Sequence, residues 1–135
     1  MLKTSHALVL LVVAVLALAG CATQGSTVGM QPVPITDFKM VAGKWQGPVT
    51  GISSKRDDWV EVTITPEGRF DFGIARTIGV FQGGGPLTLA DGKMQGQGER
   101  GAIVYTLYQG GDRRVLKGDA TLSDGRQVSA TLTPR

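Results

Sequence analysis

Histidine and cysteine are almost missing from this chain. Its 135 residues include one histidine, His6, and one cysteine, Cys21, so nothing beyond residue 21 carries an imidazole or a thiol. Nucleophilic sites of the Ser-His-Asp and Cys-His kinds need an imidazole base, and zinc and copper sites are usually built on imidazole or thiolate. A single cysteine also excludes an intramolecular disulfide. We therefore expect no enzymatic activity, no metal and no cofactor.

Strong charge of one sign and long apolar runs are lacking as well. Lys and Arg number 14 against 11 Asp and Glu, for a formal net charge of +3, and these residues are dispersed along the chain. That balance is too weak to indicate a nucleic-acid partner. The longest apolar run covers residues 7–19, whereas a membrane-spanning helix needs roughly 20 apolar residues. Behind Lys3 and a short polar stretch, this run fits the core of a secretory signal.

The end of that run carries the most specific motif of the chain. Leu18-Ala19-Gly20-Cys21 resembles the lipobox of bacterial lipoproteins, in which a large aliphatic residue and two small residues precede an obligatory cysteine. The resemblance implies cleavage between Gly20 and Cys21, a diacylglyceryl group on the Cys21 sulfur, and an acylated amino terminus, typically with palmitate. Several acyl chains hold a protein stably, whereas one chain binds a membrane only marginally. The alternative is an ordinary secretory signal with an incidental cysteine.

Localisation and domain boundaries follow from the same stretch. In lipoproteins of bacteria with two membranes, a residue other than Asp after the cysteine favours the outer membrane. Here that residue is Ala22, so we expect a chain anchored there and facing the periplasm. Small polar residues and prolines then predict a flexible tether. The expected organisation is a signal peptide over residues 1–20, lipidated cysteine and tether over 21–40, and one domain over 41–135.

The domain reads as all-β. Period-two alternation of apolar and polar residues runs through most of it, and no window carries a helical period. Eight or nine short strands are expected, separated by turns such as Asp91-Gly92 and Asp124-Gly125. The inward faces are best defined at Val60, Val62 and Ile64, at Phe70, Phe72 and Ile74, and at Val128, Ala130 and Leu132. Short strands at this spacing indicate an antiparallel meander, which protects its edges best as a closed barrel. A β-sandwich is the alternative.

Glycine is abundant, with 20 residues in the chain, about twice its usual share of ~7%. The excess suits turns and close packing inside a small barrel. We expect Gly83-Gly84-Gly85 to form a mobile turn, because neither the Lys-Ser/Thr nor the helix of a phosphate-binding loop follows it. We also expect the barrel interior to be filled by Phe, Leu and Val side chains.

Several polar groups have a structural explanation. Asp57-Asp58 is expected in a solvated loop rather than in a metal site. Glu61 and Asp71 are expected on the outward faces of strands, and paired catalytic carboxylates need a shared cleft. Arg113-Arg114 is expected in a charged turn.

A second resemblance lies at the start of the domain. Gly43-Lys44-Trp45 resembles the Gly-x-Trp motif on the first strand of lipocalin- and avidin-like barrels. In those families the tryptophan closes one barrel end and a basic residue from a late strand often packs on it. The resemblance implies this role for Trp45, with Arg135 or Arg126 as its basic partner.

Three functional hypotheses remain open. The preferred one is a non-enzymatic envelope lipoprotein, held to the membrane by Cys21, whose barrel acts by binding another envelope component, such as an envelope protein. The second is a calycin-like barrel that binds a small molecule or a lipid. The third is an inhibitor of secreted or periplasmic hydrolases, with the loops over residues 51–58 and 83–86 as its contact surface.

Overall fold

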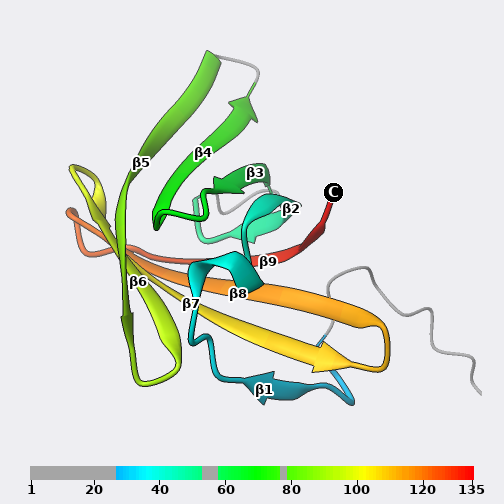
Figure 1. The fold of residues 1–135 in the computed structure, drawn as a ribbon. Helices are drawn as coiled ribbons and strands as arrows, with labels where there is room; N and C mark the ends of the chain where they lie inside the picture. Colours follow the sequence, from blue (N-terminus) through cyan, green and yellow to red (C-terminus); the bar gives the residue numbers. More distant parts are fainter. Residues whose placement is uncertain (1–26, 53–57, 77–78) are drawn as a thin grey trace, which may run out of the picture.

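The computed structural model describes residues 27–52, 58–76 and 79–135, and this part of the chain forms an antiparallel β-barrel (Figure 1). Eight strands, β2 to β9, pair in chain order, and β9 pairs with β2 to close the barrel. The predicted all-β meander and its closure are confirmed. The elements are β1 (Gln31–Val33), the 3-10 helix η1 (Phe38–Met40), β2 (Gly43–Thr50), β3 (Asp58–Ile64), β4 (Arg69–Arg76), β5 (Gly79–Ala90), β6 (Lys93–Gly98), β7 (Gly101–Gly110), β8 (Arg113–Leu122) and β9 (Gln127–Pro134).

The core follows the predicted alternation. On β3, Val60, Val62 and Ile64 are buried, and Glu61 between them is exposed. The inward faces predicted for β4 and β9 also belong to the core or pack against it. Successive side chains along a strand point to opposite faces of the sheet. Each strand therefore has one face inside the barrel and one face on the outer surface.

The glycine run is the clearest departure from prediction. Gly83-Gly84-Gly85 is not a turn but lies in the middle of β5, paired with Phe72, Asp71 and Phe70 of β4. A Cβ on Gly84 would lie 2.3 Å from the Phe70 carbonyl oxygen, and one on Gly85 would lie 2.6 Å from the Gln97 carbonyl oxygen. β5 passes here from pairing with β4 to pairing with β6. Only residues without a side chain let the three strands approach this closely.

The amino-terminal boundary of the domain also differs from prediction. β1 pairs with residues 107–109 of β7, along the edge that β6 leaves uncovered (Figure 1). Met30 and Ile35 are buried, and the Ile35 N–H donates to the Gly92 carbonyl at 2.8 Å. Asp37 caps η1 through the Lys39 N–H at 2.8 Å. Much of the stretch predicted as a tether is therefore part of the folded domain.

The two ends of the barrel differ because of this segment. η1 and the residues around it cover the end that carries the β3–β4, β5–β6 and β7–β8 turns, which we call the closed end. The other end carries the β6–β7 and β8–β9 turns, and we call it the open end. No helix in the described ranges is long and apolar enough to cross a membrane.

Candidate functional site: the open end of the barrel

Trp45 lies at the closed end, buried to 2% exposure. Its indole Nε1–H donates to the Val41 carbonyl at 2.7 Å, which ties β2 to the residue after η1. The Arg114 guanidinium lies 5.4 Å from the Trp45 ring centroid and donates to the Met40 carbonyl. A tryptophan, a basic residue and a short helix together cover this end.

The basic residue over Trp45 differs from the two proposed from the sequence. Arg135 forms an ion pair with Glu61, at 2.6 Å between Nη1 and Oε1. Arg126 belongs to the open end, where it pairs with Asp124 at 2.8 Å. Arg114 takes the position instead because it lies in phase with Leu116 and Gly118 on the inward face of β8. The prediction of a simple charged turn at Arg113-Arg114 was wrong for Arg114.

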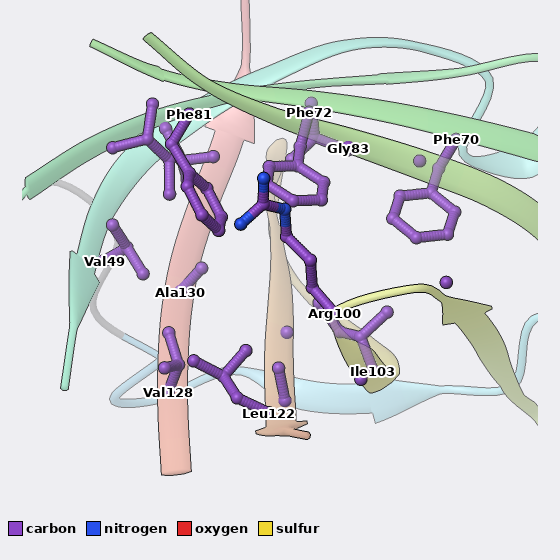
Figure 2. A pocket seen from close by; sticks show the side chains of 18 of the residues that line it. Val49, Phe70, Phe72, Phe81, Gly83, Arg100, Ile103, Leu122, Val128 and Ala130 are labelled. Atoms are coloured by element: carbon purple, nitrogen blue, oxygen red, sulfur yellow. The ribbon is translucent and has the colours of Figure 1, made fainter. Parts of the chain in front are cut away.

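The open half of the barrel holds a pocket of about 390 Å³. Figure 2 shows its walls, to which strands on all sides of the barrel contribute apolar side chains. The expectation of a filled interior holds for the closed half, where Met94, Leu107 and Leu116 are buried, and fails for the open half. Its wall residues include Val49, Val60, Phe72, Ile74, Phe81, Ile103, Ala120, Leu122, Val128 and Ala130.

Glycines shape this pocket by accommodating aromatic rings. A Cβ on Gly83 would lie 2.6 Å from the Phe72 ring, and one on Gly118 would lie 3.0 Å from the Tyr105 ring. Each of these glycines is the direct cross-strand partner of the aromatic residue. The rings therefore lie against the wall rather than across the cavity, and space remains for a ligand. This packing explains part of the glycine excess.

Tyr105 lies deep in the pocket and is 1% exposed. Its ring packs edge-on against Phe70, with 5.9 Å between the centroids. Burial raises the pKa of the Tyr105 hydroxyl well above its ordinary value, because the phenolate would lose its hydration. Tyr105 stays a neutral phenol at physiological pH.

The mouth of the pocket carries most of its charge. Gln82, Glu99, Arg100 and Arg126 contribute to its lining. Arg126 donates to Asp124 through its backbone N–H at 3.1 Å and its Nε at 2.8 Å, and these bonds hold the pKa of the Asp124 carboxyl below its ordinary value. The Arg100 guanidinium instead lies over the Phe81 ring, 3.9 Å from its centroid.

The remaining residues singled out in the sequence do not converge on the pocket. Gly20 and Cys21, with the proposed signal peptide, lie outside the described residues, as does Asp57. Asp58 starts β3 and is buried, 6% exposed, so it does not lie in a solvated loop. Glu61 and Asp71 are exposed on the outer wall, as predicted.

Sequence reasoning missed Arg100 and Arg114. The sequence does contain a signal for Arg114, because the period-two alternation of β8 places it on the same inward face as Leu116 and Gly118. Arg100 has no such signal, because it lies in the turn between β6 and β7 and its direction depends on how the barrel closes. None of the protein-family models, curated proteins or solved structures compared with this chain matches it.

Proposed function

We propose that this chain is a lipid-anchored bacterial envelope protein whose barrel binds a small, largely apolar ligand without transforming it. The observation that supports ligand binding is the pocket of about 390 Å³ at the open end. Ligand sites in proteins typically occupy ~300–1,000 Å³, with mostly apolar walls and a few polar groups. Apolar walls with charged residues only at the mouth fit that description. Among the hypotheses drawn from the sequence, the pocket favours the ligand-binding barrel.

The test is a titration of the purified full-length chain with a neutral, environment-sensitive naphthylamine probe. Saturable binding with enhanced fluorescence is the expected result. Ala120 lines the pocket and faces Ile103 and Val128 across the sheet, so Ala120→Phe should fill the cavity and weaken probe binding at least about tenfold.

A matched control uses the same substitution on the outer wall. Ala75 is exposed on β4, and Ala75→Phe should leave probe affinity unchanged. Equal binding by wild-type chain, Ala120→Phe and Ala75→Phe would show that the probe binds elsewhere and would contradict the proposal.

Anchoring through Cys21 rests on the resemblance to the lipobox. If it is correct, radioactive palmitate labels the wild-type chain, and the precursor shortens at the Gly20–Cys21 bond. Cys21→Ala should abolish labelling and leave the precursor uncut at that bond. Normal processing of Cys21→Ala would refute this part of the proposal and leave the ligand-binding part intact.

Contact with an envelope protein is the second candidate, and one surface feature favours it. Trp59 and Val80 are exposed to 47% and 63% on the outer wall. Ala75, which pairs with Val80 and is also exposed, lies between their strands on β4. A photo-crosslinking residue at Trp59 should give a discrete adduct in cells, and the same residue at exposed Thr121 on β8 should not. Identical adducts from both positions would count against a specific partner.

A further inference from the structure

Among the described residues, the guanidinium of Arg100 is the charged group most directly available to a ligand in the pocket. In Figure 2 its side chain reaches from the β6–β7 turn toward the rings of Phe72 and Phe81. Within the described ranges, Arg126 and Arg135 form ion pairs with carboxylates, and Arg100 forms none. Its close neighbour is the Phe81 ring at 3.9 Å. A cation over an aromatic face is held by only about 0.5–1 kcal/mol at an exposed site.

A second cation makes the mouth more basic. Arg126 lines the pocket as well, but Asp124 already pairs with it, and its Nη1 also lies 3.4 Å from the Ile52 carbonyl. Glu99 contributes one acid to the same rim. Among the described cations of the lining, Arg100 is therefore the one whose guanidinium donates no hydrogen bond to another described residue, and it lies next to a cavity whose deeper walls are apolar.

We propose that the ligand is a single-chain anionic amphiphile, with its tail in the pocket and its head group bound by Arg100. This inference rests on the proposed ligand-binding function and specifies the class of ligand. An apolar tail matches the walls, and Arg100 and Arg126 are the two described cations in the lining of the pocket. A carboxylate, sulfate or phosphate head at the mouth accepts hydrogen bonds from the guanidinium in a bidentate geometry.

The size of the pocket limits the tail. A water-sized group occupies roughly 30 Å³ in a liquid, so a cavity of about 390 Å³ has room for about a dozen such groups. A chain of medium length fits, whereas a diacyl lipid does not.

Arg100 also acts as a side-chain gate in this proposal. The guanidinium lies on Phe81 at the mouth. A charge-assisted bidentate bond to an anion is stronger than an exposed cation–π contact. The head group therefore draws the guanidinium off the ring, and the tail passes beside Phe72 and Phe81.

Competition with the neutral naphthylamine probe tests this inference on the full-length chain. Three competitors share one chain length, namely decanoate, decanol and decyltrimethylammonium, each used below its micelle concentration at about pH 8, where a carboxyl group is ionised. Decanoate should displace the probe about three- to tenfold better than decanol. This difference in affinity lies between what an exposed ion pair contributes and what a partly buried charge-assisted hydrogen bond contributes. The cationic competitor should be the weakest.

Variants assign the preference to the residue. Arg100→Gln should remove the difference between decanoate and decanol, and Arg100→Glu should reverse the order of decanoate and decyltrimethylammonium. Arg69→Gln is the matched control, because Arg69 is exposed at the closed end, and it should keep the wild-type preference. Equal displacement by decanoate and decanol in the wild-type chain, or an unchanged preference in Arg100→Gln, overturns the inference. Absence of probe binding in the wild-type chain would instead overturn the proposed function itself.

Discussion

The closed end of the barrel gives a quantitative prediction through Arg114→Met. The substitution keeps an unbranched apolar stem over Trp45 and removes the guanidinium. Two interactions are lost, namely the hydrogen bond to the Met40 carbonyl and the cation–π contact at 5.4 Å. A hydrogen bond from a charged group contributes about 1.5–3 kcal/mol, and a cation–π contact about 0.5–1 kcal/mol. Arg114 is half-buried, so we discount the sum and expect the free energy of unfolding to fall by about 2 kcal/mol.

Urea unfolding of the full-length chain, followed by tryptophan fluorescence and by circular dichroism, measures this loss. Because a domain of this size shifts by about 4–8 °C for each kcal/mol, the Tm should fall by about 10 °C. Arg114→Lys should recover part of the loss, since it keeps the charge without the planar donor group. Affinity for the naphthylamine probe should not change, because the pocket opens at the other end.

Lys93→Met is the control for removal of a basic residue at the same end. Lys93 is exposed at the start of β6, and surface changes of this kind usually stay within about 0.5 kcal/mol. If Arg114→Met were as mild as Lys93→Met, the idea that Arg114 fixes η1 over Trp45 would be refuted.

Two further predictions concern the barrel wall and the pocket floor. A Cβ on Gly47 would lie 1.9 Å from the Thr131 carbonyl oxygen, whereas one on Gly73 would meet nothing within 4 Å. Gly47→Ala should therefore lower the free energy of unfolding in urea by about 2–3 kcal/mol or prevent closure of the barrel. Gly73→Ala should be neutral or stabilising by up to about 1 kcal/mol. A comparable loss in both would contradict the close approach of β2 and β9. Burial raises the pKa of Tyr105, so below about pH 10, the ordinary tyrosine value, the folded and unfolded states are both protonated. Above it only the unfolded state ionises, and stability falls. Tyr105→Phe should remove about 1 kcal/mol of that fall near pH 11, measured as the free energy of unfolding against pH. If the variant lost stability above about pH 10 as steeply as the wild-type chain, Tyr105 would have to ionise in the folded state.

The strands could be predicted because their signals are local. Val60, Val62 and Ile64 alternate with polar residues, and Asp-Gly pairs mark the turns, so neither inference needed knowledge of distant contacts. Closure into a barrel followed from the number of strands and their need to cover edges. These features depend on the backbone and on burial, which a sequence pattern reports directly.

The errors have a common physical origin in contacts between distant segments. Gly83-Gly84-Gly85 reads as a turn because glycine permits turns, and only the approach of β4 and β6 explains its place within a strand. Ile35 lies in a Pro-rich stretch, and its burial depends on the Gly92 turn far along the chain. The pocket depends on how all the strands close together, and Arg100 becomes part of it only through that closure.

Cavity formation and barrel stability are separated along the barrel axis. Trp45, Arg114 and η1 fill and cover one end, and the rings that lie against Gly83 and Gly118 leave the other end hollow. Large side chains at the open end could therefore change without loss of the packed closed end. This division is why we expect Arg114→Met to alter stability alone and Ala120→Phe to alter binding alone.

The position of the amino-terminal segment at the closed end predicts how the domain is oriented on a membrane. The described chain begins beside the β7–β8 turn, where Met30 contacts Gly110, so a lipid on Cys21, as we propose, would hold the barrel by its closed end. Residues 22–26 span at most about 17 Å when extended, so this anchor would keep that end near the bilayer and turn the mouth toward the aqueous side. Cys21 is the only cysteine and its sulfur would carry lipid, so an introduced cysteine can be labelled alone. In vesicles with quencher-bearing lipids, a dye on Asp112→Cys at the closed end should be quenched more than a dye on Ser123→Cys at the mouth. The opposite order would mean that the pocket opens onto the membrane and exchanges ligand with it directly.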